Sequence, residues 1–399
     1  MIVQALVRLL NRVWPKKTGA VVFISRPDFA DNPRALFDWL LKTEDYGKYT
    51  ITWIITGKEI PLSHNDPRFR DIKFYPKDSF HSFFSFFTAE IIVTSHNQYV
   101  TLVNPERQLY VSIGHGIPLK CLGYLHEQEQ LSRKVRKQRT AKLELQRKNI
   151  GLLVATSPTV KTILSGCFHV PGSKIDITGY PRNDDLFIND TSLLQKGLFP
   201  EIMISKLFVF MPTFAETNEA RKKSFLYALE NEVVERDRLF SFLDQNSCSM
   251  IIKLHPREWD LHESLSRTLV HPRIKVLSGE MPSGLSLYQM LAATDCLVTD
   301  FSSVAYDFLL LLRPMIFVKN NVLEYSHSRG LTVTPLLDWA PGRPVETLSE
   351  LITAMYAVVL GEDEHIEERR RTQRILHQYC DAESSARLWA AIMHRRIMN

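Results

Sequence analysis

The sequence lacks the features of disulfide-stabilised and zinc-ribbon proteins. Its 399 residues include only five cysteines, which lie far apart and form no Cys-x-x-Cys pair. An odd number of scattered cysteines argues against both a disulfide framework and a zinc ribbon. We therefore expect free thiols and a protein that works in a reducing cytoplasm.

Long hydrophobic runs are also missing. No segment reaches the roughly 18 uninterrupted apolar residues that a transmembrane helix requires, so we expect no membrane span. The first 17 residues resemble a signal peptide only superficially. Arg8 and Arg12 interrupt the apolar run, and no small-residue cleavage site follows.

The chain has no strong excess of charge. Lys and Arg total 49 against 44 acidic residues, and a formal net charge of +5 does not by itself indicate a nucleic-acid-binding protein. Hydrophobic residues make up 45% and charged residues 23%, which is typical of a folded protein with a large core. At roughly 150 residues per domain, the length favours two domains.

Short apolar runs, each followed by a stretch with helical periodicity, indicate a parallel α/β architecture. They lie at 20–25, 49–56, 90–95, 109–113 and 151–156 in the first half, and at 207–212, 250–256, 274–278, 296–300 and 314–319 in the second. The pattern lapses between them at 189–206. We predict an α/β fold of two Rossmann-like domains facing a cleft, with a first domain over 1–190 and a second over 207–399 that includes the amphipathic C-terminal helices.

Parallel sheets bind ligands at the carboxyl ends of their strands, and polar residues stand at several of the predicted ends. His115 lies between two glycines in SIGHGIPLK, where little bulk shields its imidazole, and Lys120 follows. Asp300, Ser302 and Ser303 follow another strand and precede an apolar helix, an arrangement that suits a phosphate. An exposed turn and an ordinary capped helix are the structural alternatives.

Two further segments follow strands. In IIKLHPRE, Lys253, His255 and Arg257 occupy alternate positions, so all three could project to one side and contact an anionic phosphate. In TGYPRNDD, Pro181 fixes a turn that presents Arg182, Asn183 and Asp184. The second signal is weak alone, because Asn-Asp turns are common.

Taken in order, these motifs resemble the CDP-glycerol glycerophosphotransferase family, the teichoic acid primases and polymerases, over about residues 91–387. HGIPLK is similar to the family's HGTPLK, GYPRND to its G-x-P-R-N/D turn, KLHP to its K-x-H-P element, and TDFSSVAYDF to TDYSS-x-x-x-D. EYSHSRG at 324–330, PG at 341–342 and DAESSARLW at 381–389 also fit family elements. The resemblance implies a GT-B type fold and transfer of glycerol phosphate from CDP-glycerol to a hydroxyl, with release of CMP.

The resemblance also implies roles for individual residues. His115 matches the family's proposed general base, and His255 is a second catalytic candidate. The implied donor-binding residues are Lys253, Arg182, Asn183, Thr213, Asp300, Ser302, Ser303 and Asp307. No DxD-like pair lies on a loop, so neither a metal nor a cofactor is expected. Departures from the family pattern at Ile117, Ala215, Asn320 and Asn321 leave CDP-ribitol open as the alternative donor.

The family's lipid-linked saccharide acceptor implies contact with a membrane surface. The basic segment 132–148 suits anionic headgroups or a lipid pyrophosphate, and the acceptor and membrane candidates are Lys120, Arg133, Lys134, Arg136, Lys137 and Arg139. Residues 1–17 form a potential amphipathic helix that either lies on the bilayer or packs on the protein. The Phe-rich segment 79–90 precedes a strand and is expected to be a core helix. We expect a cytoplasmic protein, peripheral at the inner face of the membrane.

Two rival interpretations remain at this level. The same fold also serves nucleotide-sugar glycosyltransferases and epimerases, since fold does not determine chemistry. The segment between Arg133 and Arg147 could instead be a nucleic-acid-binding arm, but this would leave the four strand-end motifs unexplained. We therefore expect no nucleic acid among the partners.

Overall fold

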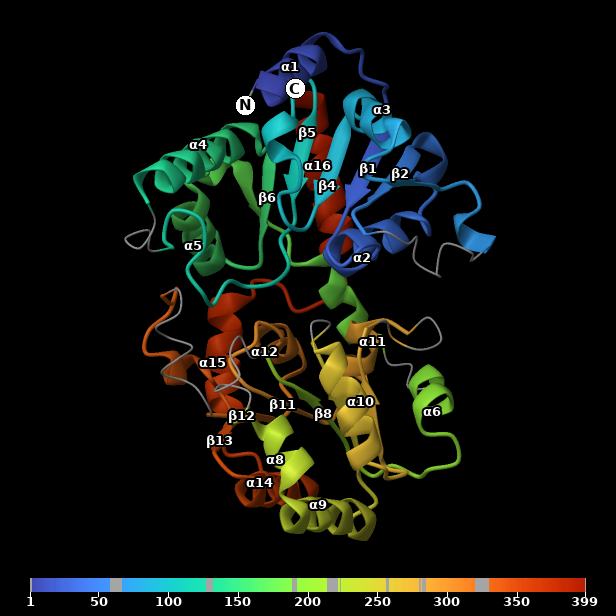
Figure 1. Ribbon diagram of the computed structural model, residues 1–399, viewed down its shortest axis with the longest axis vertical. Coiled ribbons are helices and arrows are strands. Elements are labelled where there is room, and N and C mark those ends of the chain that lie inside the picture. Colours follow the sequence, from blue (N-terminus) through green and yellow to red (C-terminus); the bar gives the residue numbers. More distant parts are fainter. Residues whose placement is uncertain are drawn as a thin grey trace. The chain divides into compact units, whose positions relative to one another are not determined.

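The structure is a computed structural model that describes residues 2–57, 67–126, 132–188, 192–213, 222, 224–255, 258–279, 281, 285–319 and 330–398. The chain forms two compact units, whose elements are labelled in Figure 1. The first contains Met1–Asp184 and Leu376–Asn399, and the second contains Asp185–Ile375. Among the described residues, no helix is both long enough and apolar enough to cross a membrane. All five cysteines are free thiols.

The first unit is built on a seven-stranded parallel sheet with the order β3-β2-β1-β4-β5-β6-β7. Its strands are β1 (Ala20–Ile24), β2 (Thr50–Ile55), β3 (Lys73–Pro76), β4 (Ile91–Thr94), β5 (Leu109–Ser112), β6 (Leu152–Ala155) and β7 (Ile175–Ile177). The strands β4, β5 and β6 are buried at every position. Continuous burial is expected of parallel strands covered on both faces.

Helices cover this sheet. They are α1 (Ile2–Val13), α2 (Asp31–Leu40), α3 (Phe80–Thr88), α4 (Arg133–Asn149), α5 (Pro158–Phe168) and α16 (Ser384–Met398). Phe23 on β1 stacks on Trp53 of β2 with ring centroids 5.2 Å apart, and Phe37 of α2 meets Trp53 edge-on at 5.7 Å. These aromatic contacts fix α2 on the sheet, and α2 begins next to the loops that carry the candidate site.

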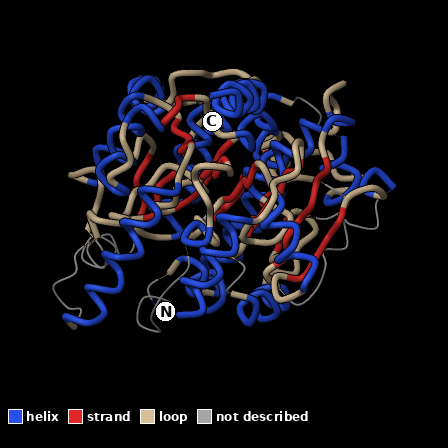
Figure 2. The backbone as a smooth tube through the Cα atoms, turned by 90° about the horizontal axis from the view of Figure 1, so that it is seen from above, coloured by secondary structure: helices blue, strands red, loops and turns tan. Residues whose placement is uncertain are grey.

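The second unit repeats the plan with a six-stranded parallel sheet of order β10-β9-β8-β11-β12-β13. Its strands are β8 (Leu207–Met211), β9 (Ser249–Lys253), β10 (Ile274–Leu277), β11 (Cys296–Thr299), β12 (Met315–Val318) and β13 (Arg343–Val345). Its helices are α6 (Ser192–Leu198), α8 (Phe225–Asn231), α9 (Val233–Gln245), α10 (Trp259–Thr268), α11 (Leu287–Ala292), α12 (Val304–Phe308), α14 (Leu348–Leu360) and α15 (Ile366–Leu376). In Figure 2 the strands run through the interior with helices outside them. The predicted α/β fold of two Rossmann-like units is confirmed.

The last helix does not follow the predicted domain division. We assigned all C-terminal helices to the second domain, but α16, red in Figure 1, packs on β5 and α2 of the first unit. The backbone N–H groups of Ser384 and Ser385 donate to the Asp184 carboxylate at 2.9 and 2.8 Å, and Arg395 pairs with Asp176 at 2.7 Å. These contacts join residues about two hundred positions apart, so sequence periodicity could not reveal them.

Candidate functional site

The loop after β5 presents His115 in the first unit. Gly114 and Gly116 on either side have φ values of +77° and +131°, a backbone region that only glycine adopts readily. The Tyr180 hydroxyl donates to the Gly116 carbonyl at 3.3 Å and so ties this loop to the turn after β7. The buried strand therefore ends in a sharp turn that leaves His115 exposed.

The surroundings of His115 favour its neutral form. Partial burial lowers the pKa of His115 and the Arg182 guanidinium acts in the same direction, whereas Asp31 and a hydrogen bond to the Ser95 backbone oppose them. The ring of His96, from the loop after β4, stacks on His115 with centroids 4.1 Å apart. A neutral imidazole can accept a proton, which is the requirement for a general base.

The buried side chain of Asn32, which the motif analysis missed, holds three loops together. Its Nδ2 donates to the Gly114 carbonyl at 3.1 Å, and its Oδ1 accepts from the Arg182 backbone N–H at 3.1 Å. Beside it, Arg182 Nη1 pairs with Asp31 Oδ1 at 2.6 Å, with both side chains about 10% exposed. The polar pair Asp31 and Asn32 after the first strand could have indicated this role. An Asp-Asn pair at the start of a helix, however, usually indicates an N-cap.

Arg182 and Asn183 thus lie beside the His115 loop in the first unit, whereas the other predicted donor-binding residues lie in the second. Both residues are largely buried, which fits a role in positioning loops. Asp184, the next residue of the motif, holds the start of α16. The turn that we predicted as a set of ligand contacts therefore also connects the His115 loop to α16.

In the second unit, Thr213 and Asp300 join the ends of the neighbouring strands β8 and β11. The backbone N–H and hydroxyl of Thr213 donate to Asp300 Oδ2 at 2.8 and 2.6 Å. These bonds fix the two loops that a ligand at this edge would contact. Ala215, Asn320, Asn321, Arg257 and residues 324–329 of the family motifs lie outside the described residues.

Lys253 is the last residue of β9, which pairs with β8 on the side away from β11, and His255 follows it. The Lys253 ammonium is mostly buried and donates to the Gly279 carbonyl at 2.9 Å, and burial lowers its pKa. His255 is exposed. A cation at a strand end and an exposed imidazole two residues away are groups that can bind a phosphate, and this role stays a prediction.

Ser302 and Ser303 stand at the start of α12, as predicted, but Ser303 does not serve as a conventional cap. Ser303 occupies the N-cap position in helical conformation, and its side chain makes no capping hydrogen bond. Both residues are partly exposed. Their hydroxyls can therefore turn towards a ligand.

Asp307 lies inside the second unit, where it can orient the helices near the predicted donor site. Its carboxylate is fully buried and accepts a hydrogen bond from the Tyr288 hydroxyl of α11 at 2.7 Å. This bond holds α11 against α12, because the helical position of Asp307, one turn after Ser303, points into the unit. The role of Asp307 in donor binding stays a prediction.

The predicted basic segment forms α4, and four of its five candidate charges are exposed: Arg133, Lys134, Arg136 and Lys137. Arg139 differs, because its guanidinium donates to the Gly123 carbonyl at 3.3 Å and contacts His126 Nδ1 at 2.7 Å. Arg139 therefore fixes the 123–126 loop. Lys120 is partly exposed in the loop before it.

The Phe-rich segment forms α3, and it is amphipathic rather than wholly core as we predicted. Phe86 and Phe87 are buried, but Phe80 is 76% exposed and Phe83 and Phe84 are exposed as well. A helix that precedes a strand covers the sheet with only one face. The prediction was therefore wrong for the outer face.

The first helix, α1, packs on the protein and is also exposed on its outer side. Asn11 is fully buried and donates to Gln108 Oε1 and to the Leu102 carbonyl, each at 2.8 Å. Trp14, just after α1, meets Phe84 of α3 edge-on at 6.1 Å. We call the exposed apolar residues of these two helices the α1–α3 face: Leu6, Leu9, Leu10, Val13, Phe80, Phe83 and Phe84.

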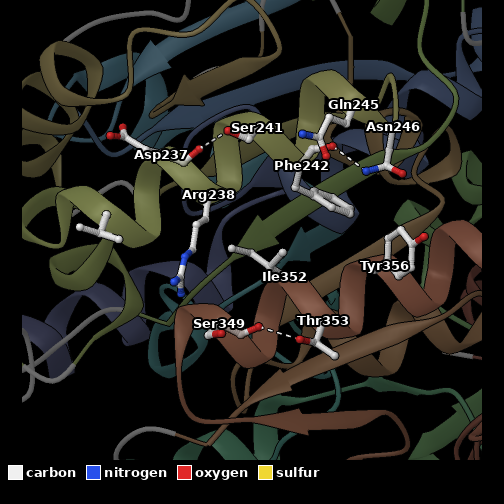
Figure 3. Close-up of a pocket in the computed structure, with 11 residues that line it drawn as sticks. Asp237, Arg238, Ser241, Phe242, Gln245, Asn246, Ser349, Ile352, Thr353 and Tyr356 are labelled. Carbon is white, nitrogen blue, oxygen red and sulfur yellow. Dashed lines mark hydrogen bonds between the residues drawn. The ribbon is translucent and has the colours of Figure 1, made fainter.

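A separate hollow lies between α9 and α14 of the second unit (Figure 3). None of the predicted site residues lines it. Two of its hydroxyl groups are turned to their own helices, since Ser241 donates to the Asp237 carbonyl and Thr353 to the Ser349 carbonyl. Among the described residues, no three His, Cys, Asp or Glu side chains cluster as a metal site would require.

Comparison with known proteins supplies independent findings. A family model described as CDP-glycerol:poly(glycerophosphate) glycerophosphotransferase matches residues 6–394. The teichoic acid glycerol-phosphate transferase of Staphylococcus aureus is 27% identical over 373 residues, which cover 91% of this chain and 90% of the relative. The teichoic acid poly(glycerol phosphate) polymerase of Bacillus spizizenii is 23% identical over 86% of this chain and 84% of its own. The structure of the wall teichoic acid polymerase TagF matches 99% of this chain and 93% of its own with a TM-score of 0.80 at 19% identity, which shows a common fold.

Proposed function

Because the chain belongs to the CDP-glycerol:poly(glycerophosphate) glycerophosphotransferase family and is a CDP-glycerol glycerophosphotransferase of teichoic acid biosynthesis, we propose specific roles for its residues. The acceptor is a hydroxyl of a lipid-linked saccharide, and His115 is the general base. The observation that carries this assignment is the exposed imidazole in a glycine turn at a strand end, with its pKa lowered by partial burial.

The reaction exchanges one phosphorus–oxygen bond for another. The acceptor oxygen attacks the phosphorus that bears glycerol, its proton passes to His115, and the bond to CMP breaks. A neutral imidazole suits this step, because it accepts the proton as the oxygen becomes bonded to phosphorus. The lowered pKa keeps His115 in that form near neutral pH.

The second unit holds the donor in this proposal. Lys253 and His255 at the end of β9, with Ser302 and Ser303 at the start of α12, supply a cation, an imidazole and two hydroxyls for the diphosphate. Such donors stabilise the negative charge that develops on CMP as it leaves. The Thr213–Asp300 bonds and the Asp307–Tyr288 bond keep the supporting loops and helices in place.

Product analysis tests the function directly. The protein is incubated with CDP-glycerol or CDP-ribitol and a defined lipid-linked saccharide, and CMP release and product mass are followed. We expect glycerol phosphate to be transferred and CDP-ribitol to react poorly. Preference for CDP-ribitol would favour the alternative donor, and transfer of a sugar would reject the proposal. The number of glycerol phosphates per acceptor distinguishes priming from chain extension.

A membrane surface is part of the proposal, because the acceptor carries a lipid. The α1–α3 face offers apolar side chains to the acyl boundary, and Lys17, whose ammonium lies 5.3 Å from the centre of the Phe84 ring, adds a cation beside it. The exposed charges of α4 favour anionic headgroups. Together these features support reversible, peripheral association with an anionic bilayer.

A further inference from the structure

The candidate base His115 is one member of a pair of stacked imidazoles. The rings of His96 and His115 are 4.1 Å apart and inclined by only 5°. They come from the loops after the adjacent strands β4 and β5. The ring of His96 therefore covers one face of His115 and limits its rotation.

Ser95, almost fully buried, connects the two rings. Its backbone accepts a hydrogen bond from His115, and its hydroxyl oxygen lies 2.8 Å from His96 Nδ1. The same oxygen accepts from the Arg26 backbone N–H at 3.2 Å, and the hydroxyl can donate its proton to His96 Nδ1 when that nitrogen is unprotonated. This arrangement suits a neutral His96.

The charges around the pair agree with a neutral His96. Burial and the nearby His115 lower the pKa of His96 to about 4, with Arg26 and Arg182 acting in the same direction and Asp31 opposing. The neutral ring excludes water from one face of His115 without adding a charge.

We propose that His96 is a positioning residue for the reaction, which by stacking orients the His115 ring and shields one face of it from water. This inference rests on the proposed role of His115 as the base. It requires an aromatic ring at position 96 and does not require that ring to exchange a proton. His96→Phe keeps the stacking surface, whereas His96→Ala removes it.

The test measures the His115 titration directly, by NMR of the full chain labelled with ¹⁵N-histidine. In His96→Ala, water reaches the face of His115 that His96 covers in the parent, so the pKa of His115 should rise by about half a unit or more. The acid limb of kcat/KM should move to higher pH by the same amount, and kcat should fall while KM for CDP-glycerol changes little. His96→Phe should stay close to the parent in all three measurements.

His169→Asn is the matched control. His169 stacks on Tyr124 with centroids 3.8 Å apart in the same unit, and asparagine tolerates its positive φ of 52°. This variant loses a stacked imidazole away from the site and should leave the His115 titration unchanged. An unshifted titration in His96→Ala, or inactivation of His96→Phe as severe as that of His115→Ala, would overturn the positioning role. A shifted titration in a protein whose activity survives His115→Ala would reject the proposed base and leave the coupling of the two rings standing.

Discussion

At the scale of single residues, the catalytic proposal depends on His115. His115→Ala removes the only proton acceptor that we assign to the acceptor hydroxyl, so turnover should fall roughly a hundredfold or more. Binding of CDP-glycerol, measured by calorimetry, should stay close to the parent because the proposed donor contacts lie in the second unit. Near-normal turnover in the folded variant would remove His115 from the mechanism.

The pH dependence follows from the direction of the His115 shift. A base works when deprotonated, and burial lowers the pKa of His115 from its ordinary value of about 6.5. Activity is therefore lost only as the pH falls through the lowered value, and kcat/KM at pH 6.5 should be more than half of its plateau. A pH–rate profile with an acid limb centred above pH 7 would contradict this environment for the base.

At the scale of elements, the end of β9 and the start of α12 should act together on the donor. His255→Ala or Ser303→Ala should weaken CDP-glycerol binding and lower kcat/KM, each roughly tenfold or more, because a hydrogen bond to a charged phosphate is lost. Ser241→Ala is a suitable control, since its hydroxyl bonds to its own helix at the Asp237 carbonyl. Unchanged affinity in both test variants would place the nucleotide elsewhere.

Sequence reasoning succeeded where a prediction depends only on residues that are adjacent in the sequence. Apolar runs predicted the strands, and polar residues after them predicted where His115, Lys253, Ser302 and Ser303 would stand. It failed where a role depends on a distant partner. Asp307, for example, bonds to the Tyr288 hydroxyl, and Asn32 bonds to Gly114 and Arg182. Only the folded chain brings such pairs together.

The two kinds of membrane contact can be separated by vesicle sedimentation. With vesicles of equal parts phosphatidylglycerol and phosphatidylcholine, changing Arg133, Lys134, Arg136 and Lys137 to Gln should weaken binding roughly tenfold or more and reduce its salt dependence. Leu9→Ser with Phe80→Ser should weaken binding at every salt concentration, because apolar burial is not screened. Turnover on a short, lipid-free acceptor should persist in both variants.

Val270→Ser provides the control for the apolar variant. Val270 is 76% exposed, as Phe80 is, but it lies in the second unit and outside the α1–α3 face. Its replacement should leave vesicle binding unchanged. If the parent ignores anionic vesicles, or both test variants bind as tightly as the parent, the membrane part of the proposal fails.

At the scale of the whole molecule, the chain leaves the first unit at Asp184 and returns to it at Leu376. Asp184 sits at the point of departure and holds the start of the returning helix α16 with both carboxylate oxygens. Gly179, a few residues earlier, has a φ of +81°, and a Cβ there would lie 2.4 Å from Ser384 Oγ. The turn that carries Arg182 beside His115 thus contacts α16 at two places, through Asp184 and through Gly179.

Asp184→Ala should therefore loosen α16 and the turn after β7 together. Two backbone N–H groups lose their acceptor, at a cost of about 1–3 kcal/mol in the stability of the first unit. Hydrogen exchange should show faster exchange in α16 and β7 and no change in β9 of the second unit.

Asp45→Ala, which removes an exposed ion pair with Lys48, is the control and should leave exchange in α16 and β7 unaltered. Because Arg182 lies on the loosened turn, kcat should fall with little change in donor affinity. Faster exchange in β9 with α16 unaffected would show instead that the last helix stabilises the second unit, as the sequence alone had suggested.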